Sequence, residues 1–561
     1  MIEDARRVAG LAGVPELFYC TISEFMQDIE KNATNLPVYS GELYLETHRG
    51  TLTSMHNVKR DNRKAEFALR DMEFLGVAAG KPKHERADEL LEVLLINQFH
   101  DILPGSSINE VYVQTKQEMD KLIYDLKAIA GEYAAELTEP CDKSYTFFNT
   151  LSFGRSDNIY IENFEGGLEG AKVQHVTDIM GRKLAVVGGV ELDAFGAKTL
   201  TVTDKPCDSC ESPFKFDGTT LETPHLVVKF GEGCGIESLV YKKTGREVRR
   251  PGSEPLGTFW MGEDVPQAWD NWNIDYDQKF KMKPTGELIS REVVANGPVE
   301  FRIRQKVKLS ETSSLVQDII FSASSPRVDF HTAVDWHERH QLLKVGFDVD
   351  VFTQTIKNEI QFGNIDRPTT ENNEYETAKF EVCNHKWSDL SESRFGVALL
   401  NDCKYGISCS GSDMRLSLLK SGIRPDTTGD AGLHEMTYSL LPHEGAFSAE
   451  TVVREAYMLN VPVYVAKGSL KPGYEAPVLV SAPNVIVETV KPAELIENAY
   501  VVRLYECERN KTCCELKFSS KAKEVYAANM LEDIGEKLPL ENGTLKVELR
   551  PFEIKTLVVK Y

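Results

Sequence analysis

A change of pattern after Pro140 constrains the fold of this chain more than any other feature of its sequence. From there to the C-terminus, short stretches alternate apolar and polar residues or run apolar, as in "KSYTFFNTLSF" (143–153), "VDFHTAVDWHER" (328–339) and "TLKVELRPFEIKTLVVKY" (544–561). Turns rich in glycine, aspartate and asparagine divide these stretches. Short strands at such spacing are typical of β-sandwiches. Roughly four hundred residues of this pattern predict several sandwich layers, the last of them a small terminal sandwich.

The segment before Pro140 has the periodicity of helices instead. A first helix is predicted over about 57–80, because Gly80 and then Pro82 form a normal helix stop. A second helix is predicted from about Glu85 to His100. A third is expected to begin at Ser107, which with Glu110 matches a capping box. Three helices joined by short turns predict a compact bundle.

The first 36 residues have an α/β pattern. A helix is predicted over 2–12, a short buried strand over "PELFYC" (15–20), and a helix from Thr21, which with Glu24 fits a capping box. A buried strand in an α/β layer needs neighbours on both sides, and these residues cannot provide them. We therefore expect the C-terminal remnant of an α/β domain; the alternative is a small helical cap. The predicted fold class is multidomain α+β, with domains at 1–36, 37–140, 141–205, 206–470 and 471–561.

Charge and composition exclude several classes of protein. The 64 lysines and arginines against 86 aspartates and glutamates give a net charge of −22, which disfavours nucleic acid as a partner. No apolar run is long enough to span a membrane, and no secretory signal begins the chain, so we expect a cytoplasmic protein. Eleven cysteines fit a reducing compartment. Cys207 and Cys210 form one CxxC, but no second pair follows at zinc-site spacing.

Three motifs besides the main candidate contain residue types that form functional sites. His337 and His340 form HxxH, but the alternation before them predicts a strand, on which they face opposite sides and cannot share a metal. Glu42 and Glu46 resemble a pair of acid/base carboxylates. Their spacing would put them close together on a helix and on one face of a strand, so it does not distinguish a site from an ordinary surface. Trp269 and Asp270 lie in "QAWDNWNIDYD" (267–277), which suits either a sugar-binding loop or a core tryptophan with a solvated loop. No phosphate-binding loop or nucleophile elbow occurs.

The main candidate is His100 with Asp101, in "NQFHDILPGSS" (97–107). The pair is expected where the second bundle helix gives way to a Pro-Gly-Ser-Ser turn. A neutral imidazole can ligate a metal, and the adjacent carboxylate can orient a hydroxyl or the metal. The alternative is structural: a histidine on the last helix carbonyls and an aspartate that forms the turn. From these residues alone, the structural interpretation is the stronger one.

A resemblance to a known family favours the ligand-binding interpretation of His100 and Asp101 over the structural one. The chain resembles glycoside hydrolase family 38 α-mannosidases, closest to their bacterial and cytosolic branch, in an ordered series of segments: "YSGELYLETHRGTLTS", "NQFHDILPGSSI", "VDWHERHQLLKVGFDVDV", "EIQFGNIDRPT", "HKWSDLSESRFGVALLNDCKYG", "RLSLLKS" and "HEMTYSLLPHEG". The resemblance covers nearly the whole chain. It implies an α/β catalytic domain, a three-helix bundle and large β-sandwiches. It also implies a zinc-dependent retaining glycosidase that removes terminal α-linked mannose and has a role in mannose metabolism.

The resemblance assigns roles to three residues of this chain. His100 matches a ligand of the single zinc ion, and Asp101 matches the aspartate that binds mannose hydroxyls. Tyr39 stands where the family usually has tryptophan for the sugar to stack on. The family's other zinc ligands, its nucleophile and its general acid/base would all lie upstream of Met1, so no catalytic residue is assigned here. Glu42 and Glu46 are expected near the site at most.

Two classes of function follow from this reading. The first is the non-nucleophilic part of a zinc-dependent α-mannosidase, inactive alone, whose partners are a mannose-containing glycan and a separately encoded N-terminal catalytic half. The second is a non-catalytic carbohydrate-binding or interaction module. Neither a nucleic acid nor a membrane is expected as a partner. The sequence leaves the oligomeric state open, with a homo-oligomer among the alternatives.

Overall fold

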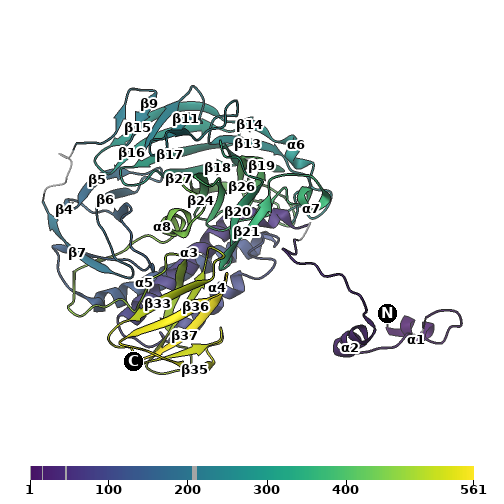
Figure 1. Cartoon of the computed structure of the whole chain (residues 1–561). Coiled ribbons are helices and arrows are strands. Elements are labelled where there is room, and N and C mark those ends of the chain that lie inside the picture. The colour runs from purple at the N-terminus through teal and green to yellow at the C-terminus, as the bar shows by residue number, and fades with distance from the viewer. Residues whose placement is uncertain (1, 16, 45–46, 205–210) are drawn as a thin grey trace. The chain divides into compact units, whose positions relative to one another are not determined.

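The computed structural model describes residues 2–15, 17–44, 47–204 and 211–561. The chain forms two compact units, Met1–Leu45 and Glu46–Tyr561, and each is described by itself. Figure 1 shows the elements of both units. The second unit contains a helical bundle and three groups of β-sheets.

The first unit has two helices, α1 (Ile2–Val8) and α2 (Ile22–Asn32). The capping box predicted for α2 is confirmed: the Glu24 backbone N–H donates to Thr21 Oγ1 at 3.2 Å, and the Thr21 N–H donates to the Glu24 carboxylate at 2.7 Å. The strand predicted over 15–20 is wrong, because the described residues of this segment are exposed and belong to no strand. A strand needs partners for its backbone hydrogen bonds, and no described residue pairs with this segment.

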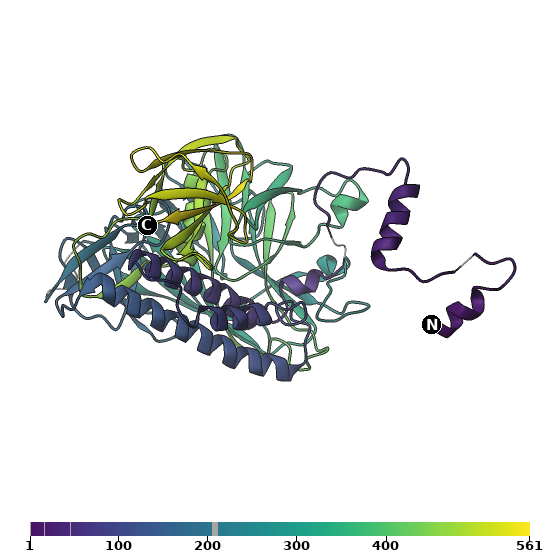
Figure 2. The same cartoon turned by 90° about the horizontal axis from the view of Figure 1, so that it is seen from below.

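The bundle of the second unit follows a short 3₁₀ helix, η1 (Arg49–Leu52). Its helices α3 (His56–Ala78), α4 (Ala87–Asn97) and α5 (Asn109–Leu137) pack against one another (Figure 2). The helix α3 forms because its buried apolar residues recur at helical spacing on one face: Val58, Ala65, Ala68, Met72 and Leu75. Gly80 lies just past its end at φ +69°, as the predicted stop requires.

Two details of the predicted bundle are corrected. The helix α4 ends three residues before His100, so the histidine lies in the following turn. The capping box predicted at Ser107 is wrong, since the N-cap of α5 is Ile108 and it makes no side-chain cap bond. The Ser107 hydroxyl donates instead to the Asp101 backbone carbonyl at 2.7 Å. The Ser107 hydroxyl therefore stabilises the turn before α5 and does not cap the helix.

A small β region follows the bundle, and every strand pair in the described part of the chain is antiparallel. Its first sheet has the order β28-β2-β7-β4 and its second β3-β6-β5. The strands are β2 (Ser144–Phe148), β3 (Ile159–Glu162), β4 (Gly167–Leu168), β5 (Lys172–Thr177), β6 (Lys183–Gly188), β7 (Ala197–Thr203) and β28 (Tyr464–Lys467). The strand β28 comes from far along the chain. Two further short strands, β1 (Thr138–Glu139) before β2 and β29 (Ser469–Leu470) after β28, pair with each other.

The largest region contains sheets of nine, six and five strands. The nine-stranded sheet runs β15 (Glu287–Asn296), β16 (Glu300–Lys308), β17 (Ser314–Ser322), β18 (Val328–Trp336), β27 (Gly432–Glu444), β24 (Phe395–Asn401), β23 (Trp387–Ser391), β20 (Thr355–Ile360) and β21 (Gly363–Pro368). The six-stranded sheet runs β14 (Lys283–Thr285), β13 (Thr258–Glu263), β19 (Gln341–Asp348), β26 (Asp413–Lys420), β25 (Gly406–Ser410) and β22 (Val382–Cys383). The five-stranded sheet runs β12 (Arg246–Glu247), β11 (Ile236–Tyr241), β10 (Leu226–Phe230), β9 (Thr220–Glu222) and β8 (Lys215–Phe216).

Short helices connect these strands, and a sandwich closes the chain. The helices are α6 (Gln278–Lys281), α7 (Glu374–Thr377), η2 (Ala449–Val453) and α8 (Arg454–Asn460). The terminal sandwich has one sheet of β30 (Val478–Val480), β33 (Thr512–Phe518) and β36 (Thr544–Leu549). Its other sheet runs β31 (Val485–Pro492), β32 (Ala499–Glu506), β37 (Ile554–Lys560), β34 (Glu524–Ala528) and β35 (Ile534–Leu538).

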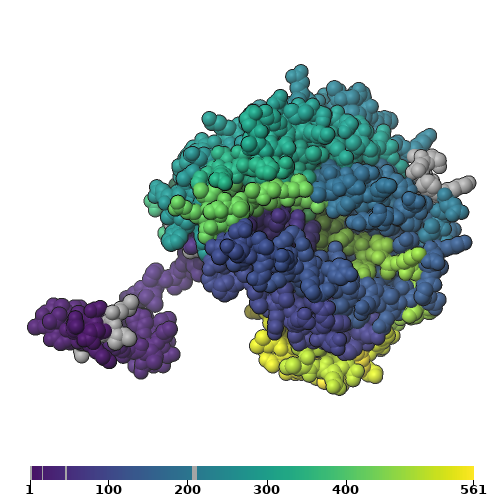
Figure 3. Space-filling view, turned by 180° about the vertical axis from the view of Figure 1, so that it is seen from behind, coloured from purple at the N-terminus to yellow at the C-terminus, as the bar shows by residue number. Residues whose placement is uncertain are grey.

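The bundle and the terminal sandwich share one apolar core. Met72 and Leu75 of α3 and Met119 of α5 belong to the same buried cluster as Val487 and Val502 of the sandwich. Figure 3 shows the dark blue bundle surface directly beside the yellow sandwich. The predicted fold class, multidomain α+β with a three-helix bundle followed by β-sandwich layers, is confirmed. No helix among the described residues is long and apolar enough to cross a membrane.

Candidate functional site

His100 and Asp101 lie on the surface of the turn between α4 and α5. The Nε2 atom of His100 is 3.5 Å from the Asp101 carboxylate, and the side chains are 71% and 43% exposed. The imidazole ring packs on Phe99, with the ring centroids 4.2 Å apart. The pair therefore faces solvent, and both side chains are accessible to a ligand.

Hydrogen bonds from the start of the next helix fix the position of Asp101. The Ser106 hydroxyl donates to the Asp101 carboxylate at 3.1 Å. The backbone carbonyl of Asp101 accepts from Ser107 Oγ at 2.7 Å and from Tyr112 Oη at 3.4 Å. One carboxylate oxygen is thus held from within the turn, and this orients the group before any ligand arrives.

A buried lysine holds the same turn from inside. The ammonium group of Lys59, on α3, donates to the carbonyl of Leu103 at 2.9 Å, to that of Pro104 at 3.3 Å, and to that of Ser54. Lys59 is 4% exposed, and this burial lowers its pKa to about 7. Burial of an ammonium group costs free energy, and the three hydrogen bonds to carbonyls offset part of that cost.

A loop of the large β region reaches the same turn. The Asn271 side chain donates to the Gly105 carbonyl at 2.9 Å, and the Ser54 hydroxyl donates to the Asn271 carbonyl at 2.7 Å. Asp270 anchors this loop by accepting from the Ile423 N–H at 2.7 Å. Asp270 therefore has a structural role, whereas the Trp269 side chain is exposed. The turn that carries His100 and Asp101 is braced from two separate parts of the second unit.

Tyr39 belongs to the first unit. Its side chain is exposed, and its hydroxyl donates to the backbone carbonyl of Glu42 at 2.9 Å. Glu42 is half-buried, and Glu46 lies outside the described residues. The roles predicted for Tyr39, His100 and Asp101 stay predictions.

The two histidines of the HxxH motif contact different acids. The strand β18 ends at Trp336, so both histidines lie in the turn that follows it. His337 Nε2 is 2.8 Å from Asp335, whereas His340 Nε2 is 3.2 Å from Asp270. Each histidine has its own carboxylate partner, as a structural role requires. Cys207 and Cys210 lie outside the described residues.

One cluster of metal-ligating residue types occurs among the residues that the structure describes. Asp178, His331 and Glu435 bring one ligand atom each to within 4.8 Å of one another. Arg182 contacts both carboxylates, at 2.6 Å for Asp178. A guanidinium already balances their charge, so we read the cluster as an ion-pair network. His100 is not part of any such group among the described residues.

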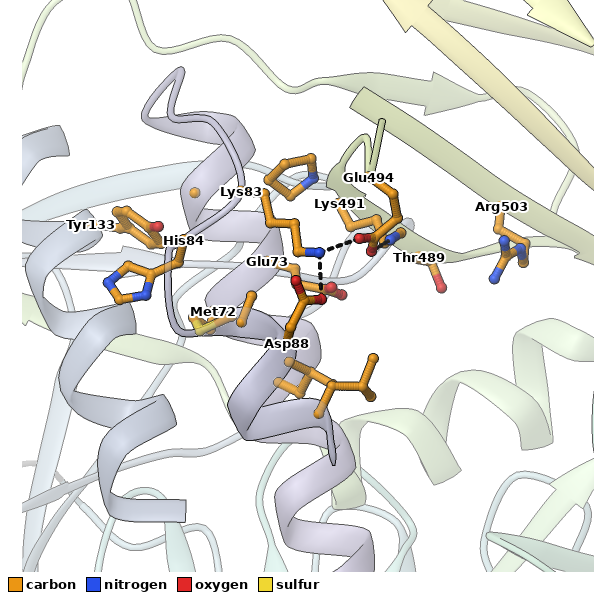
Figure 4. A pocket seen from close by; sticks show the side chains of 15 residues that line it. Met72, Glu73, Lys83, His84, Asp88, Tyr133, Thr489, Lys491, Glu494 and Arg503 are labelled. Carbon is orange, nitrogen blue, oxygen red and sulfur yellow. Dashed lines mark hydrogen bonds and ion pairs between the residues drawn. The ribbon is translucent and has the colours of Figure 1, made fainter. Parts of the chain in front are cut away.

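A cavity of about 250 Å³ lies between the bundle and the terminal sandwich (Figure 4). Lys83 bridges Asp88 and Glu494 across it. Glu73 of α3 lines the cavity, and its burial raises its pKa to about 7, although Lys491 opposes the shift. The carboxyl of Glu73 therefore ionises near neutral pH.

Three segments along the chain match domain families of known proteins. Residues 46–137 match the "Alpha mannosidase middle domain", residues 221–428 the "Glycosyl hydrolases family 38 C-terminal domain", and residues 484–557 the "Glycosyl hydrolases family 38 C-terminal beta sandwich domain". The chain contains the middle and C-terminal domains of glycoside hydrolase family 38 α-mannosidases. The first of these matches spans the bundle with His100 and Asp101, and the other two span the large sheets and the terminal sandwich.

Relatives and solved structures of this family extend the likeness to the whole chain. The human "Alpha-mannosidase 2C1" is 32% identical over 100% of this chain and 54% of its own length. The yeast "Alpha-mannosidase" of Saccharomyces cerevisiae is 30% identical over 99% of this chain and 52% of its own length. The chain thus spans about half the length of these relatives. The crystal structure of an α-mannosidase from Enterococcus faecalis V583 has the same fold, with a TM-score of 0.80 at 16% identity, over 100% of this chain and 74% of that one.

Sequence reasoning missed the two residues that brace the candidate turn. Lys59 lies in a helix rich in charged residues, and nothing in its spacing separates it from solvent-facing lysines such as Lys64. Asn271 lies in the "AWDN" stretch, whose indole and carboxylate drew attention to sugar binding. The local signal in the sequence is Gly105, since glycine after proline supplies the positive φ that a tight turn requires.

Proposed function

We propose that this chain is part of a zinc-dependent retaining α-mannosidase of the cytoplasm, and that it supplies one wall of the zinc and mannose site. In this proposal His100 is one zinc ligand and Asp101 binds hydroxyl groups of the terminal mannose, with Tyr39 as a stacking surface. The observation that carries the proposal is the exposed and braced His100–Asp101 turn within the bundle matched by the family's middle domain.

The residues present fit these two roles chemically. His100 offers a solvent-facing imidazole, and neutral imidazole is a common zinc ligand. Asp101 keeps a carboxylate that is partly open to solvent and oriented by Ser106. When bound, zinc would supply a Lewis acid toward sugar oxygens. Beyond that, this chain binds and orients the sugar.

The proposal assigns no catalytic carboxylate to this chain. Retaining hydrolysis uses two carboxyl groups, one that attacks the anomeric carbon and one that protonates the leaving oxygen. We propose that both come from a catalytic half outside these 561 residues, and that the chain alone does not hydrolyse mannosides. A mannose-containing glycan is the proposed substrate.

Zinc affinity separates this function from its alternative, a non-catalytic carbohydrate-binding module. A site of four ligands binds zinc tightly, whereas one histidine binds it weakly. We expect the chain supplemented with the catalytic half to retain one zinc per complex through dialysis, and the complex with His100→Ala to lose it. His337→Ala is the matched control, because that exposed histidine lies in another turn. Equal zinc retention in all three proteins would refute the role of His100.

A further inference from the structure

A second cleft in the described part of the chain begins at the candidate turn itself. It has a volume of about 620 Å³, within the ~300–1,000 Å³ of small-ligand sites. Gln98 precedes the His100–Asp101 pair by two residues, and Leu103 and Pro104 follow it; all three line the cleft. Residues of α3 form one wall together with Gln98, and other walls come from the tip of the β20–β21 hairpin and from the terminal sandwich. The turn that carries His100 and Asp101 therefore contributes residues on both sides of the pair to the lining of this cleft.

The bundle wall of this cleft carries planar polar groups. The Gln98 side-chain amide donates to Asn62 Oδ1 and to Glu66 Oε1, each at 2.9 Å. The Glu66 side chain remains open to solvent, yet protein surrounds it closely enough that desolvation raises its pKa. Both amide hydrogens of Gln98 are used within this wall, and the Glu66 carboxylate offers acceptor oxygens to sugar hydroxyls.

The hairpin wall carries an aromatic ring. Phe362, between β20 and β21, has a left-handed backbone at φ +52°, a strained conformation for a residue with a side chain. Its ring meets that of Tyr505 edge-on, with centroids 5.5 Å apart, and the residue stays partly exposed at the cleft. An aromatic ring in the same cleft as polar groups suits the apolar face of a sugar.

The charges along the cleft disfavour an anionic ligand. Lys386 pairs with Glu359 at 2.8 Å, and the ammonium of Lys59 is occupied by backbone carbonyls. Glu66 and Glu488 add two acids to the lining. His385 also faces the cleft, and burial lowers its pKa to about 3, so its imidazole is neutral at physiological pH and offers one donor and one acceptor.

We propose that this cleft binds the neutral sugar units that follow the terminal mannose of an oligosaccharide substrate. The inference rests on the proposed function for its place in the reaction, but the cleft lies within this chain and its binding can be measured without catalysis. Glu66, Gln98 and Phe362 are the residues that select an oligosaccharide over a simple mannoside.

The first test is direct binding of an α-linked mannotriose to the 561-residue chain, by ligand-observed NMR and calorimetry. We expect the unmodified chain to bind, and both Phe362→Ala and Glu66→Gln to weaken binding about tenfold. Phe352→Ala is the control, because that ring is 86% exposed and lies outside the cleft. Absence of binding, or equal binding by the cleft variants and the control, would overturn the proposal. Glu66→Gln changes no volume, so it keeps the test valid if Phe362→Ala does not fold.

The second test separates this inference from the proposed function. In the complex with the catalytic half, Phe362→Ala should raise KM for mannotriose about tenfold and leave KM for an aryl α-mannoside unchanged. An active complex with unaltered KM for both substrates refutes the cleft and leaves the function standing. Conversely, an inactive complex whose chain still binds mannotriose through Phe362 refutes the function and supports the cleft.

Discussion

At the scale of single residues, the position of the candidate turn depends on a buried lysine of α3. Lys59 binds the carbonyls of Leu103 and Pro104, which lie two and three residues after Asp101. Both residues are half-buried, and the ammonium group is a hydrogen-bond partner of both carbonyls. Unpaired buried acceptors cost about 1–3 kcal/mol, so the turn should loosen when the ammonium is removed.

We therefore expect Lys59→Met to raise amide hydrogen exchange in residues 102–107 by about tenfold or more, with a small change in the melting temperature of the whole chain. Zinc retention by the complex should fall with it. Lys344→Met is the control, since that buried lysine binds Glu381 far along the chain from the turn. If both variants leave exchange in the turn unchanged, Lys59 has no positioning role.

A second residue-scale prediction concerns the cavity between the bundle and the terminal sandwich. The folded pKa of Glu73 is raised to about 7, above its ordinary value near 4.5. The folded state therefore binds the proton more tightly, and this contribution to stability is present below pH 4.5 and lost as pH rises through 7. Lys491, Glu494, Glu532 and Arg503 also act on this carboxyl.

Glu73→Gln should accordingly stabilise the chain at pH 8, by on the order of 1–3 kcal/mol, and change little at pH 5. Urea unfolding at the two pH values measures the difference. Glu85→Gln, an exposed glutamate beyond the end of α3, is the control and should show no such pH dependence. A gain at pH 5 equal to that at pH 8 would contradict the assignment.

The residues of the site show where prediction from sequence stops. His100 and Asp101 were found because a family motif contains them, and their own spacing favoured a structural role. Lys59 and Asn271 gave no signal, because their contacts join residues that are 44 and 166 positions apart. Such contacts follow from the tertiary fold, which local patterns do not contain.

At the scale of elements, the bundle was predicted well and the N-terminal strand was not. Helix α3 begins and ends within two residues of its predicted bounds, because helical periodicity and a Gly80 stop are local signals. A strand depends on partners elsewhere in the chain, so the apolar stretch at 15–20 could not by itself identify one. For the same reason the pattern after Pro140 predicted sandwiches and not the order of strands within them.

The turn between α4 and α5 provides a prediction at this scale. Gly105 has φ +91°, and an added Cβ would lie 2.6 Å from the Ser54 carbonyl oxygen. Gly105→Ala should destabilise the second unit by about 2–4 kcal/mol, because backbone strain and a steric clash combine. Gly80→Ala is the matched control at φ +69° with no atom within 4 Å, and should cost only about 1 kcal/mol. Equal losses of stability in the two variants would contradict the packing described for the turn.

The apolar face of α2 gives a second element-scale prediction. Ile22, Phe25 and Met26 are all exposed on this helix, next to Phe18 in the preceding segment. Exposed apolar residues in this density promote association. We expect the chain to self-associate at micromolar concentration, and a Phe18→Ser, Phe25→Ser double variant to shift it toward monomer in sedimentation analysis. A monomeric chain whose first 36 residues resist proteolysis would show that this face is covered.

At the scale of the whole molecule, the bundle and the β regions act as one support for the candidate turn. The bundle shares its core with the terminal sandwich, and the large β region contributes Asn271 to the turn. The arrangement agrees with the fold of the Enterococcus faecalis α-mannosidase. In our account this support presents a zinc ligand and a sugar-binding carboxylate, while the catalytic carboxylates come from elsewhere.

The most direct test of that account is hydrolysis of a chromogenic α-mannoside by the purified 561-residue chain with added zinc. We predict no turnover by the chain alone, and turnover when the catalytic half is supplied. Turnover by the chain alone would contradict the account, because the attacking and protonating carboxylates would then have to lie within this sequence.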